Sequence, residues 1–532
     1  MNTLKDYVNW KLTHADKTAE AEGYPLTMEN CKKNKRMKQL EVYGNSVQDG
    51  TPTPDNPVEV QSVGEKSVNL FDKDNFVYVS SWNVSKANVS STDTGISFVI
   101  NDKIGHVHLS LGLASDYAGK TLVLTSTSNY STNTRLVIRN PSGEAVKTSS
   151  TIGNNNGNGL YSTTLTIEED TYTNEVLCIR LYFQEEYAED GTILEAGSVL
   201  EYKDIMVAES NTPLPYEPYG KYKIPLVQRG INLFDVKTYP LTTGHWINGN
   251  TGLYLVDKMY AATPDFIPCA DLIGKTITIS RTGGSNPGIA FYDDNKTYVS
   301  GKGNGNSAYT KLTTTVPENA VYYRFCVVAD YKDTAQIQEG STVLPYESYV
   351  EPTTTNIFLD EPLRKIGDYA DYIDFKNNKV VRNIGVLNST QINKQNIMKY
   401  ASDAYGYNNS YRFAAFGLLN TNDRNLKLAY SNLLSGGGFF TSAPLTSISY
   451  SSGGFLYLRF DDENNYGVTD IATCKQWIAQ NNLLINYVRN KATEEPLNIE
   501  LPQLPKLNAK TTIIEVDTSL APSNSYGKYI KK

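Results

Sequence analysis

The tetrapeptide Asn-Leu-Phe-Asp occurs twice in the chain, at positions 69–72 and again at positions 232–235. Three further landmarks follow each copy in the same order: a Gly-Lys-Thr turn, an apolar run and a Leu-Pro-Tyr-Glu-x-Tyr ending. They stand at 119–121, 176–182 and 214–219 after the first copy, and at 274–276, 321–327 and 344–349 after the second. Four landmarks in one order predict two copies of one domain, the first longer in its loops.

The residues between these landmarks favour strands over helices. Short alternating or β-branched runs are separated by turn clusters such as 153–157 and 301–305, and the chain contains 38 Tyr and 38 Gly residues. Many short strands without a long helical period are typical of an antiparallel β-sandwich. The predicted fold class is therefore mainly β, with tandem jelly-roll-like sandwich modules.

A chain of 532 residues is too long for one hydrophobic core, so the repeats are expected to have flanking domains. Leu4, Val8 and Leu12 have helical spacing, and a basic run ends this part at Lys38. The segment reads as a helix that docks into an assembly or, alternatively, as a solvated helix face. The remaining sequence predicts a β domain with one helix, which Thr469 or Asp470 caps and whose buried face carries Ile471, Cys474, Trp477 and Ile478.

These patterns divide the chain into five parts. Three prolines between positions 51 and 57 lack backbone donors, which predicts an extended connector. The expected order is an N-terminal helical docking segment (1–38), a Pro-rich connector and strand (39–66), sandwich module 1 (67–222), sandwich module 2 (223–352) and a C-terminal β domain with one helix (353–532).

Charge and cysteine content restrict the partners. A net charge of −8 argues against nucleic acid, because phosphate neutralisation needs a basic face. The five scattered cysteines form no CxxC pair, so buried free thiols are expected in place of disulfides or a zinc site. No stretch is apolar enough to predict a membrane span or a signal peptide.

The connector YGNSVQDGTPTPDNPVEVQSVGEKSVNLFD, the endings LPYEPY and LPYESY, and the tail LPQLPKLNAKTTIIEVDTSLAPSN together resemble minor structural proteins of tailed phages of Gram-positive hosts. These are baseplate or tail-tip proteins, often with carbohydrate-binding-like β modules. The resemblance implies a virion component made in the host cytoplasm. It also implies a homo-oligomer, with a trimer favoured, that contacts other tail or baseplate proteins through the N-terminal segment.

Several motifs suggest chemistry, but each has a simpler interpretation. Gly119-Lys120-Thr121 lacks the earlier glycine of a phosphate-binding loop, and a turn followed by a strand is expected there. His106 and His108 share one strand face without an apparent third ligand, and the Asp-rich stretches 293–295 and 461–465 follow no known calcium loop. No pair of carboxylates is singled out for glycan hydrolysis. We therefore expect no metal, no cofactor and no catalysis.

Two tryptophans are the strongest ligand candidates. Trp82 and Trp246 lie 13 and 14 residues after the Asn of their tetrapeptides, in polar turn-like settings that also contain Asn83 and Asn248. An aromatic ring packs well against the C–H face of a sugar, while amide groups bond its hydroxyls. The alternative is that each tryptophan anchors a loop.

The favoured interpretation is a phage tail or baseplate protein whose sandwich modules bind host surface glycans, including cell-wall polysaccharide, without covalent chemistry. A purely structural baseplate or fibre component is the second hypothesis, and a glycan depolymerase is the third.

Overall fold

The structure is a computed structural model that describes the chain in segments: 41–78, 87–93, 95–100, 105–128, 134–149, 153–155, 160–183, 195–280, 288–303, 311–375, 377–402, 407–414, 429–439, 447–451, 454–460, 466–497, 512–517 and 526–531. The predicted docking segment 1–38 lies outside these residues.

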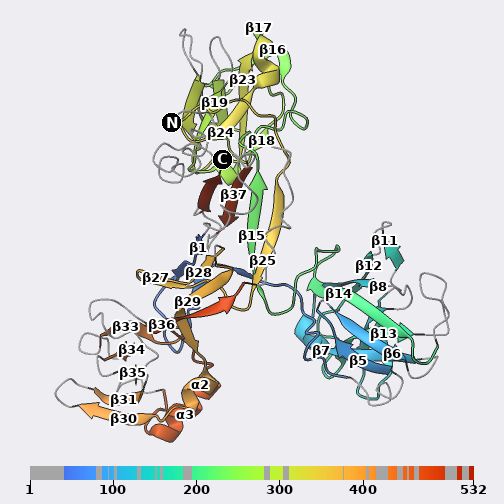
Figure 1. The fold of residues 1–532 in the computed structure, drawn as a ribbon, viewed down its shortest axis with the longest axis vertical. Coiled ribbons are helices and arrows are strands. Elements are labelled where there is room, and N and C mark those ends of the chain that lie inside the picture. Colours follow the sequence, from blue (N-terminus) through green and yellow to red (C-terminus); the bar gives the residue numbers. More distant parts are fainter. Residues whose placement is uncertain are drawn as a thin grey trace, which may run out of the picture. The chain divides into compact units, whose positions relative to one another are not determined.

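The protein is mainly β, with its strands in sandwich-like sheets and few helices, which confirms the predicted fold class (Figure 1). It divides into two compact units. One consists of Glu65–Lys223 with Phe358–Glu361, and the other contains the remaining described residues.

Module 1 is a sandwich of two antiparallel sheets. The first sheet has the order β10-β9-β13-β7 and the second β11-β12-β8-β14-β6-β5. Strands β6 to β9 alternate between the sheets in sequence order, as in a jelly roll. The strands are β5 (Ala87–Ser91), β6 (Ile96–Ile100), β7 (Gly105–Leu113), β8 (Thr121–Ser128), β9 (Arg135–Arg139), β10 (Ala145–Thr148), β11 (Gly153–Asn155), β12 (Leu160–Thr166), β13 (Val176–Phe183) and β14 (Val199–Glu209).

The core of module 1 comes from alternate residues of both sheets. In β6, Ile96, Phe98 and Ile100 are buried while Val99 is exposed, so its inward positions carry large apolar side chains. They pack with Leu122 and Leu124 of β8 in one hydrophobic cluster. Burying such side chains stabilises the fold by roughly 2 kcal/mol each.

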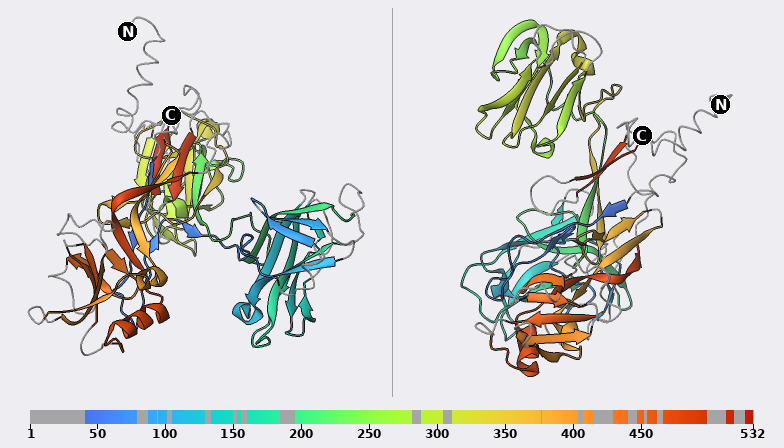
Figure 2. Two further views of the ribbon diagram at one scale, coloured as in Figure 1. Left: turned by 60° about the horizontal axis from the view of Figure 1, so that its bottom comes forward. Right: turned by 90° about the vertical axis from the view of Figure 1, so that its left-hand side faces the viewer.

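Module 2 repeats the strand order of module 1, and Figure 2 shows its strands, coloured green to yellow, in two layers. Its sheets have the orders β21-β20-β23-β17 and β22-β19-β24, which match β10-β9-β13-β7 and β12-β8-β14. An extra strand, β16, pairs with β17. The strands are β16 (Thr242–Ile247), β17 (Tyr254–Ala262), β18 (Ile267–Pro268), β19 (Thr276–Ser280), β20 (Gly288–Tyr292), β21 (Tyr298–Gly303), β22 (Lys311–Thr315), β23 (Tyr322–Val328) and β24 (Gln336–Glu339).

The Asn of the repeated tetrapeptide ties the start of each module to its end. The Oδ1 atom of Asn69 accepts hydrogen bonds from the backbone N–H of Phe71 (3.0 Å) and Val207 (3.1 Å). Its Nδ2 donates to the carbonyl oxygens of Ile205 (3.1 Å) and Glu217 (3.0 Å). Glu217 belongs to the Leu-Pro-Tyr-Glu ending, so one buried amide joins three segments that are distant in sequence.

Two other residues of the tetrapeptide, Phe71 and Asp72, also have structural roles. Phe71 is buried in the core of module 1. The Oδ1 of Asp72 accepts from the backbone N–H of Asp74 (3.0 Å) and Asn75 (3.1 Å), which closes a turn. The motif is thus an anchor followed by a core residue and a turn.

The strand that enters module 2 and the strand that leaves it pair with each other. β15 (Tyr222–Arg229) leads into it and β25 (Thr353–Leu359) leads out, and the two are neighbours in one sheet. The C-terminal hairpin of β37 (Thr512–Asp517) and β38 (Tyr526–Lys531) joins the same sheet, where β37 pairs with Leu226–Arg229.

The predicted connector contributes strands to the C-terminal domain. β1 (Glu41–Tyr43) pairs with β28 (Tyr372–Asp374), and β2 (Ser46–Val47) pairs with β3 (Gln61–Ser62). Between them the proline-containing stretch makes a tight turn at Pro54 and Asp55, where the backbone N–H groups of Thr53 and Asn56 donate to each other's carbonyl oxygens at 3.0 and 3.1 Å. The Val58 N–H then donates to the Asn432 carbonyl oxygen at 2.8 Å. The prediction of an extended connector is wrong at this turn, because the fixed φ of Pro54 also suits the second position of a tight turn.

The C-terminal domain contains two five-stranded sheets, β1-β28-β29-β36-β32 and β30-β31-β35-β34-β33, and the short hairpin β26-β27. The strands are β26 (Lys365–Ile366), β27 (Tyr369–Ala370), β28 (Tyr372–Asp374), β29 (Lys379–Leu387), β30 (Met398–Ser402), β31 (Tyr407–Ala414), β32 (Ala429–Ser431), β33 (Ser435–Phe439), β34 (Ser447–Tyr450), β35 (Phe455–Arg459) and β36 (Ile485–Pro496).

The predicted helix is α3 (Ile471–Gln480), and a one-turn helix, α2 (Ser389–Asn393), lies beside it (Figure 1). Asp470 caps α3, because its Oδ1 accepts from the Thr473 N–H at 2.8 Å. Cys474, Trp477 and Ile478 are buried as predicted. Ile471 shares this face but is the first residue of the helix, where the helix end leaves it exposed.

Candidate functional site

The outer face of one sheet in module 2 carries aromatic side chains. In β23, Tyr323, Phe325 and Val327 point into the sandwich core, while Cys326 belongs to a second cluster on the other face. Six half-buried rings pack against that second cluster: Trp246, Tyr254, Tyr260, Phe266, Tyr298 and Tyr322. The outward face of an antiparallel sheet is ordinarily polar, so this set marks the face as a candidate binding surface. We call these six residues the aromatic surface.

Two ring pairs lie on the hairpin formed by β16 and β17. His245 stacks on Tyr254 with ring centroids 4.7 Å apart and an interplanar angle of 8°. Trp246 lies against Tyr260 with centroids 6.1 Å apart and a tilt of 33°. Both pairs cross from one strand to the other, and such cross-strand aromatic pairs stabilise a hairpin.

Arg324 supports the middle of the aromatic surface from β23. Its guanidinium carbon lies 4.4 Å from the ring centroid of Tyr254 and 5.0 Å from that of Phe266. Its Nε donates to the Thr263 carbonyl oxygen at 3.0 Å. Cation–π contacts with two rings stabilise the positions of Tyr254 and Phe266.

The turn between β16 and β17 lies over the same sheet. The hydroxyl of Tyr292 donates to the Gly252 oxygen at 2.6 Å, and that of Tyr298 donates to the Gly249 oxygen at 3.0 Å. A Cβ atom at Gly249 would lie 2.3 Å from the carbonyl carbon of Lys302, so no larger residue fits there. Burial raises the pKa of Tyr292, which keeps this hydroxyl protonated as a donor.

The structure places one predicted ligand pair at this surface. Trp246 is part of the aromatic surface, and Asn248 shapes the turn, because its Oδ1 accepts from the Asn250 N–H at 3.0 Å. Trp82 and Asn83 lie outside the described residues. Sugar binding by all four residues stays a prediction.

The other motifs have structural roles where they are described. Gly119 and Gly274 have φ angles of +75° and +72°, and strands follow both. His108 is buried and its Nδ1 lies 2.8 Å from Nη1 of Arg139. Asp293 accepts from the backbone N–H groups of Asn295 and Thr297, which is a turn. Among the residues the structure describes, no group of three or more His, Cys, Asp or Glu side chains has the arrangement of a metal site.

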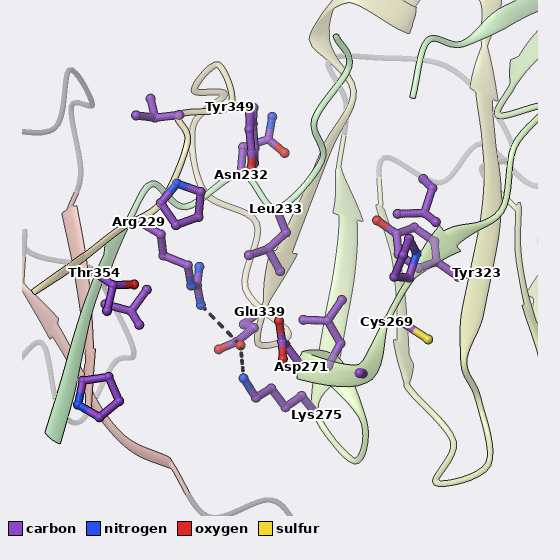
Figure 3. Close-up of a pocket in the computed structure, with 18 residues that line it drawn as sticks. Arg229, Asn232, Leu233, Cys269, Asp271, Lys275, Tyr323, Glu339, Tyr349 and Thr354 are labelled. Carbon is purple, nitrogen blue, oxygen red and sulfur yellow. Dashed lines mark ion pairs between the residues drawn. The ribbon is translucent and has the colours of Figure 1, made fainter. Parts of the chain in front are cut away.

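A pocket of about 530 Å³ lies at the end of module 2 where β15 leads in and β25 leads out (Figure 3). Glu339 lies between two cations in its wall. Its Oε1 is 3.3 Å from Nη2 of Arg229 and 2.9 Å from Nζ of Lys275. Asp271 and Tyr349 also line the pocket.

One member of the pocket lining is a cysteine, which raises the question of a nucleophile. Cys269 is buried, and this burial raises the pKa of its thiol to about 12. A thiol with this pKa stays protonated near neutral pH and is a poor nucleophile. The pocket wall therefore offers hydrogen-bonding and apolar groups.

The sequence analysis did not predict this pocket, although both modules carry the same Lys–Glu pair at equivalent positions. Lys275 and Glu339 occupy the same places as Lys120 and Glu209 of module 1, which form the same ion pair at 2.9 Å. The pair in module 1 is well exposed, with side-chain exposures of 42% and 58%, whereas Lys275 and Glu339 are 22% and 8% exposed. Residues from β15 and β25 enclose the second pair and turn a surface contact into a pocket wall.

Comparisons with known proteins are limited to structural similarity. No protein-family model and no curated protein matches the sequence. The chain is similar to the N-terminal CBM22-1–CBM22-2 tandem domain of Paenibacillus barcinonensis Xyn10C, at 9% identity and a TM-score of 0.19, over 56% of this chain and 98% of that one. It is also similar to procruciferin, an 11S globulin of Brassica napus, at 9% identity and a TM-score of 0.11, over 50% and 87% of the two chains. Similarity of this extent carries no information about a ligand.

In the described part of the chain, no helix has the length and apolar character that crossing a membrane requires.

Proposed function

We propose that the protein binds surface glycans non-covalently through its sandwich modules, as part of a phage tail or baseplate. The observation that supports glycan binding is the aromatic surface of module 2, where six half-buried rings occupy a sheet face that is ordinarily polar. The proposed virion role is supported by the sequence resemblance described above.

The arrangement suits a sugar chain. The C–H face of a pyranose packs on an aromatic ring, and successive sugars along a chain meet successive rings. The imidazole of His245 stacks on Tyr254 at this surface, and Asn248 lies in the turn that follows Trp246. Each ring contact contributes on the order of 1 kcal/mol, so binding by one module is weak.

An oligomer of weak glycan sites can bind a glycan surface with high apparent affinity. Once one copy of a linked set is bound, the others rebind at a high effective concentration, so the apparent affinity exceeds that of one site by orders of magnitude. A homotrimer attached to the tail through residues 1–38 satisfies this requirement, and it follows from the phage resemblance. The net charge of −8 favours a neutral or hydroxyl-rich partner over nucleic acid.

Retention of the full chain on purified Gram-positive cell walls tests the proposal. We expect the wild type to sediment with walls and to lose retention when the wall polysaccharide is removed. Trp246→Ala combined with Tyr260→Ala is expected to weaken retention at least about tenfold, because two ring contacts are lost. Trp246→Phe keeps a ring and should recover most of the binding.

Tyr219→Ala is the matched control, because Tyr219 is an exposed aromatic residue of module 1. Circular dichroism verifies that each variant is folded. If the wild type is not retained on any wall, or if the double variant is retained equally well, the aromatic surface is not a glycan site. Release of reducing sugar from the walls would instead indicate a depolymerase.

A further inference from the structure

The pocket at the end of module 2 is separate from the aromatic surface, because the two share no residue. Its volume of about 530 Å³ falls within the range of small-molecule sites, which is roughly 300–1,000 Å³. All of its lining residues belong to one compact unit.

The charged wall has a buried ion pair at its centre, a half-buried lysine beside it and the exposed Asp271 at its edge. The side chains of Arg229 and Glu339 are each 8% exposed, and Lys275 is 22% exposed. Arg229 also donates from Nη1 to the Gly230 oxygen at 3.1 Å, which fixes the guanidinium. Figure 3 shows Glu339 between the two cations, with Asp271 beside them.

The formal charges of this wall cancel. Arg229 and Lys275 contribute two positive charges, and Glu339 and Asp271 contribute two negative ones. The wall therefore presents donors and acceptors side by side without a net attraction for either kind of ion. A hydroxyl group donates one hydrogen bond and accepts others, so neighbouring hydroxyls match such a wall.

The rest of the lining is largely apolar. Leu233, Pro225 and Pro268 present aliphatic surface, and the ring of Tyr349 lies near Asn232 in Figure 3. A ligand that fits both parts needs a hydroxyl-rich edge and an apolar face, which is the character of a sugar ring.

We propose that this pocket is a second ligand site of module 2, and that it takes a neutral sugar of one or two rings, such as the end of a glycan chain. The residues of this site all lie outside the aromatic surface. The proposal is therefore independent of whether the aromatic surface binds a glycan.

Binding of small glycosides to the full chain tests this inference. The neutral probes are the methyl glycosides of glucose, galactose, N-acetylglucosamine and rhamnose, and methyl glucuronide is the anionic probe. Saturation-transfer NMR detects binding, and titration calorimetry gives the dissociation constants. We expect at least one neutral glycoside to bind, and methyl glucuronide to bind more weakly.

Matched variants locate the site. Lys275→Met and Asp271→Ala are each expected to weaken that binding about tenfold or more, because each removes a charged hydrogen-bonding group. Lys120→Met removes the equivalent ion pair of module 1 and should leave the affinity unchanged. Trp246→Ala should also leave it unchanged, which separates this site from the aromatic surface.

The inference is overturned if none of the four neutral glycosides binds, or if Lys275→Met and Asp271→Ala bind them like the wild type. Tighter binding of methyl glucuronide would also overturn it, because the wall would then select an anion. If the wild type is not retained on walls but still binds a neutral glycoside, only the function proposed for the aromatic surface is contradicted.

Discussion

Asn69 and Asn232 make the same four hydrogen bonds at the same points of two modules. The Oδ1 of Asn232 accepts from the N–H groups of Phe234 (3.0 Å) and Ile337 (3.2 Å), as that of Asn69 does from Phe71 and Val207. Its Nδ2 donates to the oxygens of Glu347 (3.1 Å) and Ala335 (3.5 Å). The repeat in sequence is therefore a repeat of one structural anchor.

Replacing this anchor should destabilise one module at a time. Asn69→Ala leaves buried backbone groups of module 1 without partners, which costs on the order of 3 kcal/mol. We expect faster hydrogen exchange in peptides of 67–222 and unchanged exchange in 231–345. Asn232→Ala should show the reverse pattern, and uniform effects across both modules would contradict independent anchoring.

The turn between β16 and β17 should depend more on the hydroxyl of Tyr292 than on that of Tyr298. Tyr292→Phe removes the hydrogen bond to the Gly252 oxygen and is expected to destabilise the 248–253 turn by about 1 kcal/mol. Hydrogen exchange of peptides that contain this turn measures the effect. Tyr298→Phe removes a longer bond from a half-buried residue and should have a smaller effect. Equal protection in wild type and Tyr292→Phe would show that packing alone holds the turn.

The thiols should be unreactive in the folded protein. Burial raises the pKa of Cys178, Cys269 and Cys474 to about 12, and Cys326 is buried as well. Ellman's reagent at pH 8 is therefore expected to modify no more than one thiol per chain within minutes, and all five after unfolding in urea. Cys31→Ser serves as the control and should leave no rapidly reacting thiol. Two or more fast thiols in the native wild type would contradict the buried positions.

Module 1 should lose one pH-dependent contribution to its stability in acid. The hydrogen bond from Lys147, followed by that from Tyr172 at 2.9 Å, lowers the pKa of Glu168 from 4.5 to about 2. A lowered carboxyl pKa stabilises the fold above the unfolded-state value, and this contribution disappears as the pH falls from about 4.5 to about 2.

Glu168→Gln reports this contribution. The difference in urea midpoint between wild type and variant should be constant above pH 5 and should vanish near pH 2. Because the Glu168 side chain is half exposed, the difference is expected to be small. A difference that is independent of pH over this range would show that the carboxylate charge plays no part.

The sequence predicts those features of the fold that depend on residues close together in the chain. The strand runs, the Asp470 cap and the two module starts all follow from residues close together in the chain. The pairing of β1 with β28 and of β37 with β15 was not predictable, because it joins segments hundreds of residues apart. The spacing after the tetrapeptide points to Trp246, but no local pattern points to Tyr254, Tyr260 or Phe266 as its neighbours. They meet Trp246 on one surface only after β16, β17 and β18 have joined the sheet around β23.

The strands that begin and end module 1 are neighbours: Lys66 pairs with Tyr222, and the Ser67 N–H donates to the Lys221 oxygen at 2.8 Å. Module 2 has the same property through β15 and β25. A domain whose two ends meet can be removed or exchanged while the chain around it keeps its path. Each sandwich therefore has the chain geometry of an insertable unit, whose loss or replacement need not alter the segments that flank it.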